Sequence, residues 1–569
     1  MRINYISRSK QAQIKILKKK ILLIFLLISV VSIAQDENRI QPKSIQYNLR
    51  STVTPIELPP LDLDTIIAQD QINDLDKSLP WRYGISRPLV LDPERDGEWT
   101  ELGNSRGRIW QVAIWSPDAV NLSVNFNDFK LPEGAMLHLF NEERTDFSKT
   151  YTKNQNRENN QLGSWFVSGE IIWIEYYEPA NTDEIAELEI GSLIHGYRMG
   201  RVHQMIENNT RGLNDSGDCN YDVNCQVGSD YDDKKDVIKK AVALLNLGNG
   251  YLCSSSLINT TLNDKTPYLL TANHCLESSD PSFWSVRFNW MSPSPICASE
   301  EESLDIQTNF TMSGAELIAH HSLSDFALVK LHNEIPDSWD VAFAGWDKTD
   351  NSPSMEVGIH HPNGDIMKIC RDDSGAVKET ANGKEVWLIG GVTVGTGDGW
   401  EIGTTESGSS GSPLFNEDGK IIGQLYAGEA FCDGVENNND YDIYGRFGIS
   451  WEAGQTSDTR LKDWLDPNNT GQTTAETLEN VLNTQEFDDT GNLDIYPNPA
   501  NTTISIINNR YPNLEFCFYN LLGQKVFSGD MSNTINVINV ERLKEGVYFL
   551  YLLNVDTNIS STKKIVISK

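Results

Sequence analysis

The chain has 569 residues, with 39% hydrophobic side chains and a formal net charge of −33. It is too long for one ordinary domain, so three or four segments are expected. The acidic excess excludes the basic surface that nucleic acid requires, and no nucleic-acid partner is predicted.

The N-terminus has the pattern of an export signal. A basic stretch ending in Lys18-Lys19-Lys20 precedes an apolar stretch, residues 21–31, and small residues follow at Ser32 and Ala34. This pattern predicts a signal peptide over residues 1–34, cleaved after Ala34. The alternative is a membrane anchor, but the apolar run is shorter than the roughly 20 residues that a spanning helix needs.

The next segment, residues 35–211, contains no cysteine and shows the alternation of short strands, as at 108–115 and 120–124. It is predicted to be a small β domain. Its end, residues 208–212, is polar and is expected to be exposed, so cleavage after Arg211 is a plausible processing step.

Residues 212–480 again have short strands, expected at 268–271, 326–331 and 420–425, and a helical stretch at 460–465. An all-β barrel or sandwich follows from this pattern. A polar linker is expected at 481–492. The last segment, 493–569, is predicted to be a small β-sandwich.

Eight cysteines fit the oxidising environment that an exported chain meets. Cys370 and Cys517 stand apart from the other six, which predicts three disulfides and two free thiols. The residues alone leave the connectivity open. The six are Cys219, Cys225, Cys253, Cys275, Cys297 and Cys432.

The strongest chemical motif is the run from Gly408 to Pro413, which contains Ser410 between two glycines. A tight turn there exposes a serine hydroxyl as a nucleophile. The same turn aims the backbone N–H groups of Gly408 and Ser410 at a developing oxyanion. The competing interpretation is a flexible Gly/Ser loop, but the strand that follows Pro413 argues against flexibility.

Two other residues complete a hydrolytic triad. His274 follows an apolar strand and is the expected general base, while Asp325 leads into another apolar strand and would orient it. Each alone is a weak signal, because histidines are usually packed or exposed and an Asp before a strand is usually a turn residue. The order His, Asp, Ser makes the set specific.

Over residues 212–471 the chain resembles the chymotrypsin-like, two-barrel serine proteases, and among them the bacterial lysyl endopeptidases. The matching runs are 219–225, 271–275, 324–326, 344–347, 360–363, 408–413, 423–425, 442–446 and 463–467. The resemblance implies a double β-barrel and three disulfides, Cys219–Cys432, Cys225–Cys297 and Cys253–Cys275. It also implies that residues 35–211, the β-rich segment before the protease, are a pro-region.

The resemblance also implies a substrate pocket. Thr404 occupies the position of the acidic pocket residue of trypsin and cannot neutralise a cation, whereas Asp442 matches the pocket Asp of lysyl endopeptidases. The alternative is that Asp442 belongs to a solvated acidic loop. Trp387 matches a family tryptophan near the active site, and Tyr426 replaces the histidine that partners it.

Adjacent histidines at 320–321 and 360–361 could suggest a metal site. Neighbours on a strand point to opposite faces, so both pairs are interpreted as structural. No metal and no other cofactor is expected.

The C-terminal module resembles the type A sorting domain of the type IX secretion system. The match rests on 496–499, 522–523, 546–548 and 563–564. It implies the type IX machinery as a partner and a secreted product, held at the cell surface or released after transit through the periplasm.

The sequence thus predicts a secreted zymogen, expected to be monomeric, whose serine endopeptidase cleaves proteins and peptides after Lys, with Arg as the other acceptable cation. One alternative is a glutamyl-type protease of the same fold, which Thr404 keeps open. The other is a catalytically silent surface-binding homologue.

Overall fold

The structure is a computed structural model of the chain. It describes residues 41–49, 51–104, 106–180, 182, 184–198, 216–277, 279–301, 303, 310–395, 399–479, 493–508, 514–520, 525–531, 535–554 and 559–569. The predicted signal peptide, the processing site at Arg211 and the linker at 481–492 lie outside these residues. The chain divides into two compact units, 1–334 with 344–477, and 335–343 with 478–569.

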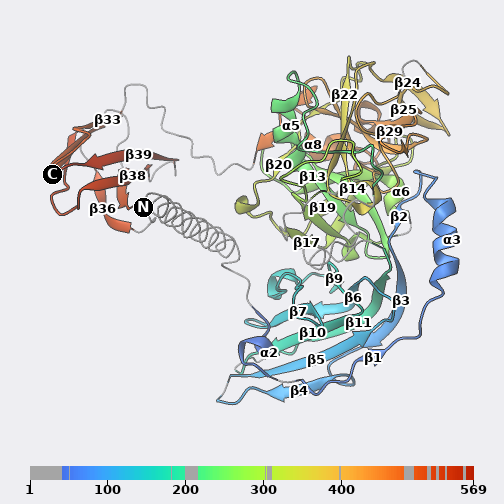
Figure 1. The fold of residues 1–569 in the computed structure, drawn as a ribbon, viewed down its shortest axis with the longest axis horizontal. Coiled ribbons are helices and arrows are strands. Elements are labelled where there is room, and N and C mark those ends of the chain that lie inside the picture. Colours follow the sequence, from blue (N-terminus) through green and yellow to red (C-terminus); the bar gives the residue numbers. More distant parts are fainter. Residues whose placement is uncertain are drawn as a thin grey trace, which may run out of the picture. The chain divides into compact units, whose positions relative to one another are not determined.

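The N-terminal segment, residues 41–198, is named the pro-region after its predicted role and contains two five-stranded sheets (Figure 1). One contains β1 (Ile56–Glu57), β4 (Glu98–Glu101), β5 (Arg108–Trp115), β7 (Met136–Asn141) and β10 (Ile171–Glu178). The other contains β3 (Gly84–Leu91), β6 (Asn121–Lys130), β8 (Leu162–Gly163), β9 (Val167–Ser168) and β11 (Glu187–Gly196). Both sheets contribute to one apolar core, which includes Ile174 and Val124. The strand predicted at 108–115 is confirmed as β5.

One helix of the pro-region, α3 (Leu63–Asn73), was not predicted from the sequence. Asp62 caps it by accepting a hydrogen bond from the backbone N–H of Thr65 at 3.2 Å. Its apolar residues do not form a buried stripe, since Ile67 and Ile72 are exposed. The helix leads into a loop, residues 74–80, and then into β2 (Trp81–Arg82).

Strand β2 joins an eight-stranded sheet of the next segment by pairing with β14. The sheet order is β17-β16-β13-β14-β15-β19-β18. The strands are β13 (Val242–Asn246), β14 (Tyr251–Leu257), β15 (Tyr268–Ala272), β16 (Ser285–Phe288), β17 (Thr311–Ser313), β18 (Ala315–His321) and β19 (Phe326–Leu331). Strands β15 and β19 confirm the predictions at 268–271 and 326–331.

A ten-stranded sheet follows, with the order β12-β23-β22-β26-β27-β30-β25-β24 and with β21 and β31 beside it. Its strands are β12 (Tyr221–Asp222), β21 (Trp346–Asp347), β22 (Glu356–His360), β23 (Lys368–Asp372), β24 (Val377–Ala381), β25 (Lys384–Ile389), β26 (Pro413–Asn416), β27 (Ile421–Gly428), β30 (Asp442–Arg446) and β31 (Thr474–Ala475). A hairpin, β28 (Cys432–Asp433) with β29 (Glu436–Asn437), lies outside this sheet.

The remaining helices are short: α2 (Lys43–Gln46), α5 (Asp232–Ile238), α6 (Asn273–Leu276), α7 (Phe447–Trp451) and α8 (Lys462–Leu465). Helix α8 lies within the predicted stretch 460–465, and α5 was not predicted. Of the helices in the described ranges, none has the length and apolar character to cross a bilayer.

The second unit contains the C-terminal module. Its sheets are β33-β34-β37 and β36-β35-β38-β39, and both supply residues to one core that includes Ile504 and Leu550. The strands are β33 (Leu493–Tyr496), β34 (Thr503–Asn508), β35 (Leu514–Tyr519), β36 (Lys525–Met531), β37 (Ile535–Asn539), β38 (Gly546–Asn554) and β39 (Ile559–Ile567). A short pair, β20 (Ala342–Phe343) with β32 (Leu478–Glu479), belongs to the same unit. The described residues are mostly β, as the sequence predicts.

Candidate active site

His274 and Asp325 meet because their strands are neighbours. Strand β15 pairs with β19 so that Ala272 lies opposite Phe326. His274, two residues after Ala272, therefore lies beside Asp325, which precedes Phe326. His274 Nδ1 donates to Asp325 Oδ2 at 2.7 Å, and the His274 backbone N–H donates to Oδ1 at 3.2 Å. Asp325 is fully buried, as the sequence predicts, and has φ +54°, a left-handed conformation that Asp tolerates better than most residues.

The Ser410 turn packs directly on β15, the strand that immediately precedes the helix with His274. Gly408 and Gly411 have φ of +91° and +80°, which favour glycine, as expected for a tight turn. Ser410 between them is fully buried rather than exposed. A Cβ on Gly411 would lie 2.2 Å from Thr271 Oγ1, so no larger residue fits there. Ser254 supports the turn with two hydrogen bonds. Its backbone N–H donates to the Ser410 carbonyl at 2.8 Å, and its hydroxyl donates to the Gly408 carbonyl at 3.1 Å.

The hydroxyl of Ser410 is occupied by the pro-region. Ser410 Oγ donates to the carbonyl oxygen of Lys77 at 3.0 Å. His274 Nε2, the nitrogen that a base would turn toward the nucleophile, is buried and has no hydrogen-bond partner among the described residues. Lys77 thus lies where the carbonyl of a substrate would meet a nucleophilic serine.

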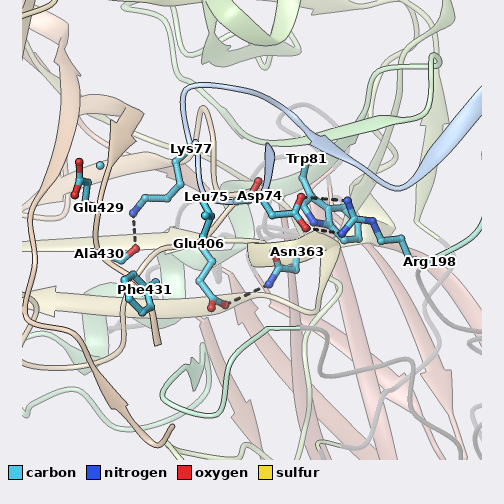
Figure 2. Close-up of a pocket in the computed structure, with 12 residues that line it drawn as sticks. Asp74, Leu75, Lys77, Trp81, Arg198, Asn363, Glu406, Glu429, Ala430 and Phe431 are labelled. Atoms are coloured by element: carbon cyan, nitrogen blue, oxygen red, sulfur yellow. Dashed lines mark hydrogen bonds and ion pairs between the residues drawn. The ribbon is translucent and has the colours of Figure 1, made fainter. Parts of the chain in front are cut away.

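The side chain of Lys77 ends at Asp442, the first residue of β30. Its ammonium group forms a buried ion pair with Asp442 Oδ1 and donates to Thr405 Oγ1 at 2.8 Å. It also donates to the Ala430 carbonyl at 2.8 Å (Figure 2). Asp442 Oδ2 accepts from Trp400 Nε1 at 2.8 Å and from the Thr405 hydroxyl at 2.7 Å. Both carboxylate oxygens of Asp442 and the ammonium group of Lys77 are therefore paired.

The charge of Asp442 depends on these contacts. Burial raises the pKa of its carboxyl above the ordinary value, while the Lys77 ammonium and the hydrogen bonds from Trp400 and Thr405 act in the opposite direction. Thr404 is also buried, but its hydroxyl lies 3.5 Å from the Thr405 carbonyl rather than on Lys77. The cation-binding threonine is thus Thr405, one residue later than the trypsin-like position.

A cavity of about 420 Å³ lies beside Lys77. Its lining comes from both segments: Asp74, Leu75, Lys77, Trp81 and Arg198 of the pro-region, and Asn363, Glu406, Ser407 and residues 428–431 of the following one. Figure 2 shows Asp74 and Arg198 side by side at one end and Lys77 reaching Ala430 at the other. This cleft is therefore a joint surface of the two segments.

A family model described as the C-terminal domain of lysyl endopeptidase matches residues 213–445. Residues 213–445 form a lysyl endopeptidase-like domain. A second model, the secretion system C-terminal sorting domain, matches residues 494–568. The sorting domain directs the chain to the extracellular space or the cell surface.

A lysyl endopeptidase of Pseudomonas aeruginosa is 27% identical over 240 residues, which are 40% of this chain and 50% of that protein. The chain thus spans about half the length of this curated relative. Among solved structures, an inactive serine-to-alanine mutant of Rv3671c from Mycobacterium tuberculosis matches with 12% identity and a TM-score of 0.23, over 36% of this chain and 82% of that one. PorZ, a type IX secretion component of Porphyromonas gingivalis, matches with 9% identity and a TM-score of 0.13, over 57% and 46%.

The lysyl endopeptidase-like domain contains three disulfides, Cys219–Cys432, Cys225–Cys297 and Cys253–Cys275. These are the pairs that the family resemblance implies. Cys253–Cys275 links β14 to the helix that carries His274. Cys370 and Cys517 are free and buried, and burial raises the pKa of the Cys370 thiol.

Tyr426 and Trp387 lie in different surroundings. The Tyr426 ring meets the His274 ring edge-on with centroids 6.1 Å apart, and Lys384 Nζ lies 4.8 Å from its centroid. Trp387 is buried and donates from Nε1 to the Ile422 carbonyl at 2.9 Å. Tyr426 is therefore the aromatic neighbour of the histidine, while Trp387 supports the sheet. Lys384 Nζ also lies 3.6 Å from Asp325 Oδ1.

The four histidines expected to be structural have separate partners. His360 Nδ1 lies 2.8 Å from Ser409 Oγ, and His361 Nδ1 donates to the Asp365 carbonyl at 2.8 Å. His320 Nδ1 lies 2.8 Å from Asn273 Oδ1, and His321 Nδ1 accepts from the Leu323 backbone N–H at 3.0 Å.

One group in the described part of the chain, Cys253, His274 and Cys275, is close enough to share a metal ion. Its two sulfurs form the disulfide and are not thiolate ligands. This group therefore gives no reason to place a metal at His274.

The sequence predicted the site residues that stand in short motifs and missed those that act through distant contacts. Lys77, Trp400, Thr405 and Lys384 were not singled out. Thr405 had a signal, since it neighbours Thr404. Lys77 had none, because its segment contains several lysines and Lys77 does not stand in a motif.

Burial makes the protein sensitive to acid through its histidines. Burial lowers the pKa of His361 from 6.5 to about 4, so an unfolded chain binds a proton in this range that the folded chain does not. We expect the free energy of unfolding to fall as pH drops from about 6.5 to about 4, by roughly 3 kcal/mol from His361 alone. Urea denaturation at pH 7, 6 and 5, followed by tryptophan fluorescence, measures this. A His361→Gln chain should lose less stability on acidification, and one with the exposed His320→Gln should behave as wild type. Equal pH dependence of the free energy of unfolding in wild type and both variants would show that His361 does not cause this acid sensitivity.

Proposed function

We propose that the chain is the precursor of a secreted serine endopeptidase that cleaves after lysine. The observation that carries this proposal is a lysine whose ammonium group is bound by the buried Asp442 and whose carbonyl oxygen contacts Ser410. A serine next to the carbonyl of a pocket-bound lysine is the arrangement needed for cleavage at that residue. The similarity of residues 213–445 to lysyl endopeptidases supports the same reaction.

In the proposed mechanism, His274 accepts the proton of Ser410 at Nε2 while Ser410 Oγ attacks the carbonyl carbon. Asp325 holds the ring, because its bond to Nδ1–H leaves Nε2 as the basic nitrogen and stabilises the cation that forms. The N–H groups of Gly408 and Ser410 bind the oxyanion. His274 then gives the proton to the leaving amine as the C–N bond breaks. Water, deprotonated by His274, hydrolyses the acyl-enzyme and restores Ser410.

The pocket favours lysine over arginine. An ammonium group has three donors, and Asp442, the Thr405 hydroxyl and the Ala430 carbonyl supply three acceptors around it. A guanidinium is planar and carries five donors, which this set does not match. A buried carboxylate also disfavours an acidic residue, so the glutamyl-type alternative is not supported. The buried His274–Asp325 pair argues against a catalytically silent homologue.

We assign the segments as the sequence predicts: a signal peptide at 1–34, a pro-region at 35–211, a double-barrel protease domain at 212–480, a linker at 481–492 and a sorting domain at 493–569. The match of the sorting domain supports the type IX machinery as a partner. Cleavage after Arg211 would cut the peptide link between the pro-region and the protease, which acts as a monomer on protein and peptide substrates once the pro-region has left.

Ser410 and Asp442 can be tested together on the processed enzyme recovered from the full chain. We expect a fluorophosphonate to label wild type and not Ser410→Ala. With a peptide library read by mass spectrometry, cuts should follow lysine, and Asp442→Ser should lower kcat/KM for lysine substrates by about 100-fold or more, since it removes one partner of a buried ion pair. The exposed Asp433→Ser is the matched control. Cuts after acidic or apolar residues, or undiminished lysine cleavage by Asp442→Ser, would overturn the specificity.

Asp325 should act on the chemical step rather than on binding. An Asp325→Asn enzyme loses the carboxylate that fixes the tautomer of His274, and we expect kcat to fall by about 10⁴-fold with little change in KM. The control is Asp458→Asn, an exposed aspartate outside the site, which should leave both constants unchanged. A fall of less than about tenfold in kcat would show that Asp325 does not orient the base.

A further inference from the structure

The loop that carries Lys77 presents one side chain inward. Leu75 and Leu79 on either side are 79% and 43% exposed, whereas Lys77 is 4% exposed. Lysine is among the residues that are almost never fully buried without a partner. In the described part of the chain, the acceptors of its ammonium group are on Asp442, Thr405 and Ala430, and all three belong to the lysyl endopeptidase-like domain. Lys77 therefore belongs to the pro-region in sequence, whereas its ammonium group is bound by the other segment.

Both polar ends of Lys77 are bound as a substrate's would be. The ammonium group is held at the pocket floor, and the carbonyl oxygen is held by the Ser410 hydroxyl at 3.0 Å. We propose that residues 74–82 are an internal peptide ligand, which inhibits the enzyme by occupying its lysine pocket with Lys77. This inference rests on the proposed function, because it takes the Ser410 site to be the active site.

The hydrogen bonds explain why the segment blocks the site instead of being cut. Acyl transfer requires the Ser410 proton to be directed at His274, while Ser410 Oγ approaches the carbonyl carbon. Here Ser410 Oγ directs its proton to the Lys77 carbonyl oxygen instead. His274 Nε2 is buried and has no hydrogen-bond partner in the described ranges. The nucleophile and its base are thus uncoupled while Lys77 is bound.

The segment is anchored on both sides of Lys77. On one side, Asp74 forms two hydrogen bonds with Arg198, at 2.6 and 3.1 Å, and the Arg198 guanidinium lies 4.5 Å from the Trp81 ring centroid. On the other side, Trp81 and Arg82 pair with Leu252 and Tyr251 in β14. A tethered ligand of this kind meets its site at a local concentration in the millimolar range, so a single pocket residue suffices for high occupancy.

The anchors also define what releases the ligand. The pro-region also contacts the protease segment through residues well before Arg211 in the sequence. Asn125 Nδ2 donates to the Gly248 carbonyl at 2.7 Å, and the Arg157 guanidinium donates to Asn333 Oδ1. Cleavage after Arg211 breaks none of these contacts. The severed pro-region therefore stays bound through them and keeps Lys77 in the pocket until it is itself degraded or displaced.

The direct test uses the intact full chain and a fluorophosphonate, with fluorescence read only from the full-length band. The chains are wild type, Lys77→Gln, Asp74→Asn and, as matched control, Lys130→Gln, which changes an exposed lysine of the same segment. We expect Lys77→Gln to be labelled at least about tenfold faster than wild type, because the pocket contact is lost. Asp74→Asn should be labelled at an intermediate rate, and Lys130→Gln at the wild-type rate. Equal rates for all four chains would overturn the proposal.

A second measurement does not depend on catalysis. In the Ser410→Ala full chain, the backbone amides of residues 74–80 should exchange hydrogen slowly. The double variant Ser410→Ala/Lys77→Gln should exchange these amides faster, while the strands of the pro-region stay protected. The double variant Ser410→Ala/Lys130→Gln should exchange both residues 74–80 and the pro-region strands at the rates of the Ser410→Ala chain. Unchanged exchange with Lys77→Gln contradicts the internal ligand, even if processed enzyme cleaves after lysine. Failure of processed wild-type enzyme to react with the fluorophosphonate contradicts the proposed function instead, and the exchange result still decides whether Lys77 holds the segment in the pocket.

Discussion

A buried charge needs a partner, and at the Ser410 site this requirement links two segments of the chain. Asp442 is fully buried at the pocket floor, where burial raises the pKa of its carboxyl. The cation that compensates it is Lys77, which lies 365 residues earlier in the sequence. Removing one partner of a buried pair is far more costly than replacing both, so neither residue is readily lost alone. The same physical demand would select a lysine in a substrate once the pro-region is gone.

Three identifiable constraints position His274, Asp325 and the Ser410 turn. The register of β15 with β19 places His274 beside Asp325, and the Cys253–Cys275 disulfide holds the helix that carries His274 to β14. Gly411 lets the nucleophile turn lie directly on Thr271. These three constraints involve no residue of the pro-region. The pro-region contributes the carbonyl oxygen of Lys77, which accepts the hydrogen bond from the Ser410 hydroxyl in place of His274.

The sequence predicts the elements and residues whose evidence is local. Strands β5, β15 and β19 follow from alternation over a few residues, and His274 and Ser410 stand in short, specific runs. Asp442 needed the family resemblance, because nothing near it in the chain distinguishes a pocket floor from a solvated loop. Lys77 could not be predicted, since its role depends on contacts with residues that are far away in sequence. Helix α3 was missed because its apolar side chains are exposed and give no periodic pattern.

The coupling energy between Lys77 and Asp442 tests most directly whether Lys77 occupies the pocket formed by Asp442. It is obtained from a double-mutant cycle in the Ser410→Ala full chain, with Lys77→Met, Asp442→Asn and the double variant unfolded in urea. Each single change should lower the free energy of unfolding by about 3–5 kcal/mol, since it strands a buried charge or polar group. The double variant should lose less than the sum, with a coupling energy of about 2 kcal/mol or more. Additive losses would show that the two side chains do not interact, and would contradict both the pocket and the internal ligand.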